Sequence, residues 1–439
     1  MNLEQENASL REALRVLQER YDRLDLSTAK KIQDLRDENE ILAEANQLLL
    51  EKQSSQSQKL DTTCVFRVPD ELLLPGTELE IHQIMTVDKV HSFGNLLSVS
   101  AHATKYEIVI TGGADKSICV HNWKSGKKLC HVETTSPVLA LAFNPHREYA
   151  NFFVAAGMDA RHALYKLVEE RDEWHIETLC HFHDHSRPGT FRVAWSESGR
   201  MFATGSRDKS VNIYQCSEIV KGQSERYIKI KSFYFNGTVE AIVFAPTDKI
   251  QDDQENSNHE SLVIAVRDDC YVHYVNCSTL EKDRVNMNPD GIEHVSYTIM
   301  DLSISPSGKY LLAATDSDRN FIFSVRHQCI KKQSRMRKLI RKNTVLRSFY
   351  GHKAGPYSQP RATWHPSEKY VISNNEENGA IFVWSIASER IVRTLDAHDG
   401  LVRDLVYLKS DSPVLITVSY DKRLKVWESP LAKTRLEFI

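Results

Sequence analysis

The sequence lacks the features of a secreted or membrane-spanning protein. Its 439 residues contain no signal peptide and no run of eighteen apolar residues, which predicts a cytoplasmic or nuclear protein that is not secreted. The eight cysteines have no paired spacing, so we expect reduced thiols in the core. A net charge of −3 gives no field that would draw the whole chain to nucleic acid or to a membrane.

The common catalytic motifs are also missing. The chain has no nucleophile elbow, no phosphate-binding loop and no zinc-protease helix motif. Most carboxylates fall in predicted turns, where Asp has a structural role. The sequence therefore predicts a protein that is not an enzyme and has no catalytic residues, cofactor or metal.

One short pattern occurs seven times between residues 112 and 427. A hydrophobic strand ends in a polar turn, and an aromatic residue follows about six positions later on a second strand. The clearest copies run from Asp421 to Trp427, Asp208 to Tyr214 and Asn378 to Trp384, and looser copies begin at Asp115, Asp159, Asp268 and Asp316. A recurrence of roughly 40 to 60 residues built from strands and turns predicts an all-β, seven-bladed β-propeller.

These units resemble the WD40 repeat family from Thr77 to Ser429. The resemblance implies a buried hydrogen-bonded chain in each blade, made of a His before the unit, a Ser or Thr, the turn Asp and a Trp. The positions that match it are His398, Ser419, Asp421 and Trp427, and then His185, Ser206, Asp208 and Tyr214. Other units depart from it: His121 stands where the first blade should have Trp, and Asn378 replaces an Asp.

The ends of the propeller are predicted to meet in one blade. Residues 84–91 are similar to residues 391–398, which precede the last unit. The early segment is therefore expected to be the outer strand of the seventh blade. This closes the ring and removes an exposed sheet edge.

The first 52 residues are predicted to form a different element, a long α-helix in a parallel coiled coil. Proline and glycine are absent from residues 1–68, and leucines recur every seven positions with Asn at several intervening ones, which favours a two-stranded homodimer. The seam is Leu3, Asn7, Leu10, Leu14, Leu17, Tyr21, Leu24, Ile32, Leu35, Asn39, Leu42, Asn46 and Leu49. A lone helix packed on the propeller is the alternative. Residues 53–77 are expected to be a linker, 78–429 the propeller and 430–439 a tail.

Three groups of residues are candidate sites. His181, His183 and His185 alternate on one strand, but His185 is better explained as the blade His, so no metal site is expected. A channel-mouth group, favoured at protein interfaces by residue type, consists of Met158, Arg207, Arg267, Tyr357 and Tyr420. A basic loop contains Lys331, Lys332, Arg335, Arg337, Lys338, Arg341 and Lys342, which would suit an acidic partner or a phosphate backbone.

Together these features favour a non-enzymatic scaffold, dimerised through its coiled coil and binding proteins or peptides on its propeller faces. The alternative is a subunit of a chromatin or RNA-processing complex that reads a modified tail or RNA through residues 331–342. A propeller hydrolase would need acids or metal ligands gathered at the channel mouth, and the sequence shows no such group.

Overall fold

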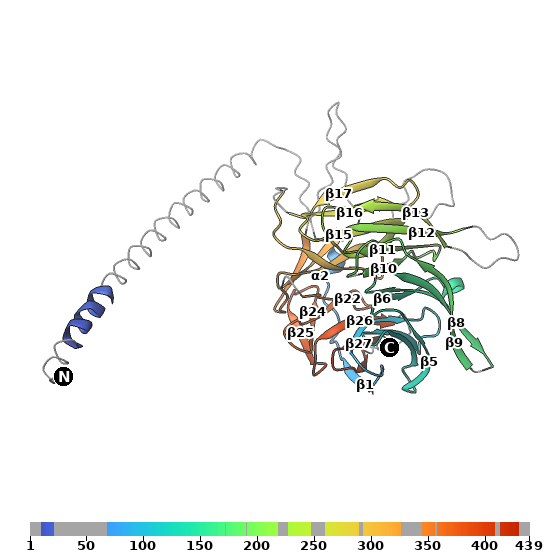
Figure 1. Ribbon diagram of the computed structural model, residues 1–439, viewed down its shortest axis with the longest axis horizontal. Coiled ribbons are helices and arrows are strands. Elements are labelled where there is room, and N and C mark those ends of the chain that lie inside the picture. The colour runs from blue at the N-terminus through green and yellow to red at the C-terminus, as the bar shows by residue number, and fades with distance from the viewer. Residues whose placement is uncertain are drawn as a thin grey trace, which may run out of the picture. The chain divides into compact units, whose positions relative to one another are not determined.

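The computed structural model describes residues 10–21, 68–171, 173–189, 191–217, 227–246, 260–288, 293–325, 345–355, 358–408 and 413–429. The chain divides into two compact units, Met1–Arg67 and Val68–Ile439. In the first unit, residues 10–21 form a helix. The second contains seven antiparallel sheets of four strands each, so the predicted seven-bladed propeller is confirmed (Figure 1).

The first four blades follow the chain in order, each from its innermost to its outermost strand. Blade 1 is β2 (Leu96–Ala101), β3 (Ile108–Gly113), β4 (Ser117–Asn122) and β5 (Lys127–Glu133). Blade 2 is β6 (Val138–Phe143), β7 (Phe152–Gly157), β8 (His162–Glu170) and β9 (Glu173–Phe182), with the short 3₁₀ helix η1 (Arg147–Tyr149) before β7. Blade 3 is β10 (Phe191–Trp195), β11 (Met201–Ser206), β12 (Ser210–Cys216) and β13 (Tyr227–Tyr234). Blade 4 is β14 (Val239–Pro246), β15 (Glu260–Val266), β16 (Tyr271–Asn276) and β17 (Lys282–Asn286).

The last three blades include the one that closes the ring. Blade 5 is β18 (Ile299–Ile304), β19 (Tyr310–Thr315), β20 (Arg319–Ser324) and β21 (Val345–Tyr350). Blade 6 is β22 (Ala362–Trp364), β23 (Tyr370–Asn374), β24 (Ala380–Ser385) and β25 (Ile391–Asp396). Blade 7 is β26 (Val402–Leu408), β27 (Val414–Ser419), β28 (Leu424–Glu428) and, from the other end of the propeller, β1 (His82–Val87).

The predicted closure of the ring is confirmed by the pairing of β1 with β28. The register runs from His82 opposite Glu428 to Val87 opposite Leu424. Val87 is buried, and Met85 packs against the same apolar cluster, which joins blades 7 and 1. The earliest strand of the propeller therefore completes its last blade.

The seven innermost strands surround the central channel. Five of them contain a bulge at the same place near their start: β2, β6, β14, β18 and β26. The extra residues there are Leu97, Leu139, Glu240, Met300 and Arg403. A bulge re-aims the side chain of its extra residue, and here it sets the chemistry near one mouth of the channel.

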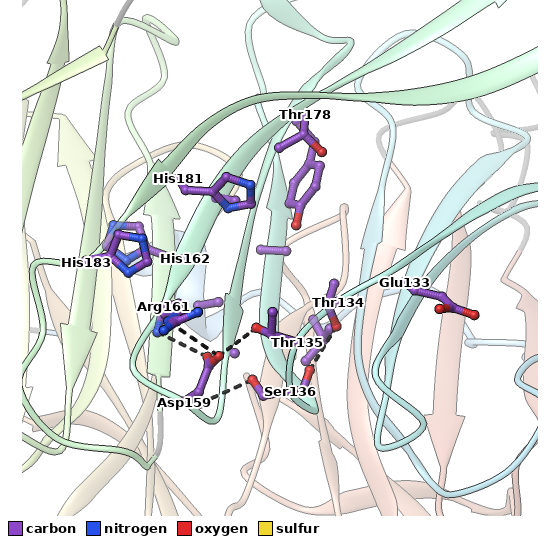
Figure 2. Close-up of a pocket in the computed structure, with 16 residues that line it drawn as sticks. Glu133, Thr134, Thr135, Ser136, Asp159, Arg161, His162, Thr178, His181 and His183 are labelled. Atoms are coloured by element: carbon purple, nitrogen blue, oxygen red, sulfur yellow. Dashed lines mark hydrogen bonds and ion pairs between the residues drawn. The ribbon is translucent and has the colours of Figure 1, made fainter.

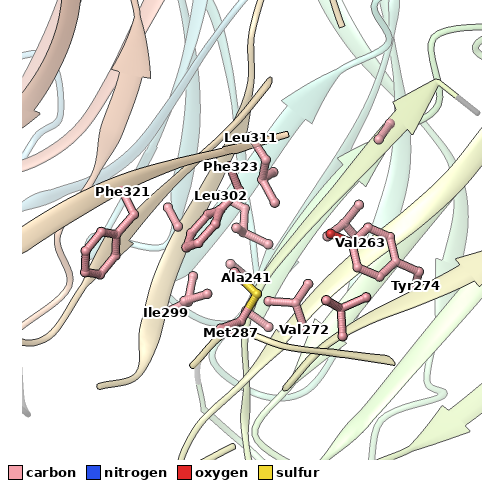
Figure 3. Close-up of a cluster of buried hydrophobic side chains, with 14 residues drawn as sticks. Ala241, Val263, Val272, Tyr274, Met287, Ile299, Leu302, Leu311, Phe321 and Phe323 are labelled. Carbon is pink, nitrogen blue, oxygen red and sulfur yellow. The ribbon is translucent and has the colours of Figure 1, made fainter. Parts of the chain in front are cut away.

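Apolar side chains between neighbouring blades make up the core. Figure 3 shows the cluster that joins blades 4 and 5, in which Val263, Leu311 and Phe323 are fully buried. Each such side chain stabilises the fold by about 1.5–3 kcal/mol relative to exposure. Packing thus holds the blades to one another, while hydrogen bonds hold together the strands within a blade.

The segment before β1 packs on blades 5 and 6. Helix α2 (Asp70–Leu73) buries Leu72 among the residues of the core cluster shared by those blades. Glu71 accepts hydrogen bonds from Lys309 Nζ, at 3.2 Å, and from the hydroxyl of Tyr310. The described part of the predicted linker 53–77 therefore packs on the propeller.

Four of the predicted seam residues lie in the helix of residues 10–21. Leu10, Leu14, Leu17 and Tyr21 lie on one face of it, and their exposed fractions are 58, 65, 64 and 68%. The other predicted seam residues, and so most of the long coiled coil, lie outside the described residues.

Replacing residues 82–87 with a Gly-Ser segment of equal length should lower the free energy of unfolding by about 3–6 kcal/mol, because the buried Val87 and the half-buried Met85 are lost and the ring opens. Urea denaturation measures this change. The same replacement of residues 391–396 in β25 is the matched control, because this outer strand belongs to a blade built from consecutive chain. An equal loss of unfolding free energy in the two variants would show that closing the ring adds no stability beyond that of an ordinary outer strand.

Candidate functional site

A buried hydrogen-bonded chain crosses blade 7 from its turn to its third strand. Asp421 Oδ2 lies 2.8 Å from His398 Nδ1, and His398 Nε2 lies 2.8 Å from Thr417 Oγ1. The same hydroxyl accepts a hydrogen bond from Trp427 Nε1 at 3.1 Å. Burial alone would raise the pKa of Asp421, but the hydrogen bond and charge interaction with His398, together with the bonds from the amides of Arg423 and Asp399, outweigh it and lower that pKa. The chain fixes the turn that carries the candidate surface.

The serine predicted for this chain has another role. Ser419 Oγ donates to the carbonyl of Gly400 at 2.9 Å and accepts from the amide of Asp421 at 3.1 Å. Residues two apart on a strand share a face, so Thr417 and Ser419 both point toward the histidine side, and Thr417 is the one that reaches the ring. Blade 3 repeats this correction: Thr204, rather than Ser206, lies 2.9 Å from His185 Nε2.

In blade 3 the aromatic residue turns to the neighbouring blade. His185 Nδ1 lies 3.1 Å from Asp208 Oδ2, as the resemblance implies. The Tyr214 hydroxyl instead donates to Asp184 Oδ2 and lies 2.9 Å from His162 Nε2 on β8 of blade 2. Burial lowers the pKa of His162 to about 3, so this ring is neutral near pH 7. Tyr214 therefore ties blade 3 to blade 2.

Blade 1 has the Asp–His–Thr part of this chain, which was not predicted from the sequence. His91 Nδ1 lies 2.8 Å from Asp115 Oδ1, and His91 Nε2 lies 3.0 Å from Thr111 Oγ1. His91 lies 24 residues before Asp115, and the corresponding separation is 23 residues in blades 3 and 7. This near-equal spacing could have identified His91 from the sequence. His121 does occupy the aromatic position, and Trp123 donates to the carbonyl of Tyr106.

The histidines of residues 181–185 do not form a metal site. His185 is committed to Asp208 and Thr204. Across the part of the chain that the structure describes, no group of three His, Cys, Asp or Glu side chains is placed to hold a metal ion.

The channel-mouth residues occupy equivalent turns of different blades. The amides of Met158, Arg267 and Tyr420 each donate to a carbonyl just before an inner strand, those of Pro137, Thr238 and Leu401 respectively. Arg207 directly precedes the turn residue Asp208. Met158 is 50% exposed and Tyr420 36%, and Arg207 is also exposed. Tyr357, the fifth predicted member, lies outside the described residues.

Arg267 differs from the other three because its side chain is held by the channel wall. Its Nε lies 2.8 Å from Glu240 Oε1, and the Glu240 side chain is only 3% exposed. Arg267 Nη2 also lies 3.8 Å from Met300 Sδ. Both contacts are with bulge residues, so Arg267 is part of the supporting structure of the mouth.

Charged side chains, half-buried or buried, also join the inner strands of neighbouring blades. Arg361 Nη1 lies 2.9 Å from Asp301 Oδ1, and Arg361 Nε lies 3.7 Å from Asp404 Oδ1. Arg192 Nε donates to the carbonyl of Glu240 at 2.5 Å, and burial lowers the pKa of Arg192 to about 9. A buried charge left without its partner is strongly destabilising, so these contacts lock the inner strands in place.

The predicted basic loop, residues 331–342, lies between β20 and β21 and outside the described residues. Its proposed role therefore stays a prediction.

Comparison with known proteins identifies the repeat. The family model described as "WD domain, G-beta repeat" matches residues 176–215 and 389–428. These spans hold the histidine chains of blades 3 and 7. The chain carries WD40 repeats in a seven-bladed β-propeller.

Similar proteins match the chain over short stretches. "WD repeat and SOCS box-containing protein 1" of Danio rerio is 30% identical over 15% of this chain and 16% of its own length. "Probable cytosolic Fe-S cluster assembly factor" of Schizosaccharomyces japonicus is 32% identical over 30% of this chain and 21% of its own. "Pre-mRNA-processing factor 17" of Homo sapiens is 25% identical over 29% of this chain and 20% of its own. The chain thus spans about a fifth or less of each relative.

No helix among the described residues is both long and apolar enough to span a membrane.

Thr417→Val should lower the free energy of unfolding by about 1–3 kcal/mol, because His398 and Trp427 lose their shared buried partner. Thr417→Ser keeps the hydroxyl and should cost less than about 1 kcal/mol. Thermal and urea denaturation of both variants test the assignment. A loss in Thr417→Ser as large as that in Thr417→Val would mean that the methyl group of Thr417 contributes as much stability as its hydroxyl.

Proposed function

We propose that this protein is a non-enzymatic scaffold that binds protein partners on the channel-mouth face of its WD40 propeller. The observation that supports it best is the set of equivalent turns that carries Met158, Arg207 and Tyr420 around the channel. WD40 propellers generally act as protein-interaction scaffolds, and the residue types at this face are those enriched at interfaces.

The rigidity of the face supports the same proposal. The turns of Arg207 and Tyr420 are backed by blades 3 and 7, whose hydrogen-bonded histidine chains and core packing are buried. A partner that binds preformed turns loses less conformational entropy than one that must first order them. Exposed Arg and Tyr side chains on a fixed frame are suited to the specific binding of a peptide or a domain.

We also propose that the N-terminal segment dimerises the protein through a parallel coiled coil. The exposed row of Leu10, Leu14, Leu17 and Tyr21 supports this, since four large apolar residues on one helix face favour burial against a partner. A dimer would present two propellers at once, which raises the avidity for a repeated or dimeric partner.

The double substitution Arg207→Glu with Tyr420→Ala should weaken binding to a partner, recovered by affinity purification with the wild type, by ten-fold or more, about 1.4 kcal/mol. The thermal midpoint should stay unchanged, since both side chains are exposed at the mouth. Lys231→Glu with Tyr234→Ala, on the exposed outer strand β13, is the matched control and should bind normally. If the control loses as much affinity as the mouth variant, the partner does not depend on the mouth.

Arg267 calls for a different expectation. Arg267→Glu would place a second carboxylate beside the buried Glu240, so it should lower stability as well as binding. A loss of binding in Arg267→Glu could therefore come from lost stability, so the double variant above leaves Arg267 unchanged.

Leu14→Asp with Leu17→Asp should convert the full-length protein to a monomer at micromolar concentration, with the propeller's thermal midpoint unchanged. Val16→Asp makes a similar change off the seam on the same helix, and should leave the dimer intact. Sedimentation velocity measures the mass. A wild-type protein that is already monomeric there would contradict the homodimer.

A further inference from the structure

Blade 2 keeps the turn Asp of the other blades but lacks the histidine chain. The Thr134 amide donates to the carbonyl of Lys116 at 2.7 Å, just as the His398 amide donates to that of Gly379 at 3.0 Å. Thr134 therefore stands where blade 7 has its histidine. Ala155 lies four residues before Asp159, the place that Thr417 takes relative to Asp421. Two larger polar side chains are thus replaced by smaller ones in blade 2.

The Asp159 carboxylate is nevertheless held in a fixed orientation. Its Oδ2 accepts from Thr135 Oγ1 at 2.6 Å, and its Oδ1 accepts from the amide of Arg161 at 3.2 Å. The amide of Asp159 donates to Ser136 Oγ at 3.2 Å, the role that Ser419 has in blade 7. Neighbouring hydroxyls and amides thus position a carboxylate that in blades 1, 3 and 7 faces a histidine.

The two small residues leave a cavity of about 390 Å³, which is within the range of ligand pockets. Figure 2 shows Asp159, Thr135 and Ser136 at one end of it and Thr178 and His181 at the other. Apolar side chains of Val138, Ala155, Ala163 and Tyr165 form part of its lining. The cavity therefore combines apolar walls with one oriented carboxylate.

The charge balance of the cavity favours a cation. Burial together with the charge of Asp159 raises the pKa of Tyr165 to about 12, so that phenol stays neutral. Arg161 Nε lies 3.9 Å from Asp159 Oδ2, but the Arg161 side chain is 56% exposed. An exposed ion pair of this kind contributes at most about 1 kcal/mol, so a better-placed cation can displace it.

We propose that the blade 2 cavity binds an arginine side chain of a partner, whose guanidinium pairs with Asp159 where other blades have their own histidine. A carboxylate has about four lone-pair sites, so each Asp159 oxygen can accept a bond beside those from Thr135 and the Arg161 amide, and the parallel N–H groups of a guanidinium can take these positions once the Arg161 side chain is displaced. The arginine stem would lie along the apolar walls. The site goes beyond the channel-mouth face, because it would bind an isolated arginine even if Arg207 and Tyr420 contact no partner.

The test uses the full-length protein and N-acetyl-arginine amide as probe, followed by ligand-observed NMR. The matched neutral probe is N-acetyl-citrulline amide, which keeps the shape and removes the charge. The arginine probe is expected to bind at least ten-fold more tightly than the citrulline probe. Equal affinities would overturn the proposal, as would N-acetyl-lysine amide binding as tightly as the arginine probe.

Two variants test whether the arginine probe binds in the cavity. Asp159→Asn removes the charge and should reduce the affinity for the arginine probe at least ten-fold. Thr134→His restores the side chain of blades 1, 3 and 7, so it should abolish binding and raise the thermal midpoint. Glu133→Gln, which neutralises an exposed carboxylate on the same lining, is the control and should bind as the wild type does.

The Thr134→His variant keeps the proposal falsifiable if Asp159→Asn fails to fold. Undiminished binding by folded Thr134→His protein would overturn the proposal, and so would an equal loss in Glu133→Gln. Failure here leaves the channel-mouth experiment unaffected, because Arg207 and Tyr420 are not part of the cavity lining.

Discussion

The pairing of β1 with β28 is the constraint on which the rest of the propeller depends. Six blades are each made of consecutive chain, and the seventh takes its outer strand from the other end. Without that strand, β28 would be an exposed sheet edge, and the apolar cluster between blades 7 and 1 would lose Val87 and Met85. Closure fixes the inner strands around the channel, and the inner strands fix the turns that carry Met158, Arg207 and Tyr420.

Within this ring the blades hold their turns in different ways. Blades 1, 3 and 7 use a histidine between the turn Asp and a threonine hydroxyl. In blade 3 the aromatic residue instead bonds across to blade 2, through Tyr214 and His162. The turns of blades 1, 3 and 7 are therefore secured by buried polar contacts as well as by packing.

Repetition made the fold predictable from the sequence, but single side-chain partners were less so. Seven copies of one pattern predict seven blades even when each copy is imperfect. Thr417 and Ser419 share a strand face, so the sequence alone could not decide which one reaches His398. From the sequence, Arg267 was predicted to be a surface residue. The bulge that brings Glu240 against it has no recognisable sequence pattern, so the contact could not be predicted. The histidine of blade 1 was not included among the predicted residues, although the similarity of residues 84–91 to residues 391–398 places His91 at the position of His398.

Blade 2 departs from the repeat in a way that changes which groups of the blade a ligand can reach. A blade with the full histidine chain fills its interior and satisfies its carboxylate internally, so it offers a ligand little beyond its turn. Blade 2 instead holds Asp159 with Thr135, Ser136 and a backbone amide, which keeps the turn in place while freeing the space beside the carboxylate. A seven-bladed ring tolerates this because closure and packing between blades stabilise the whole propeller.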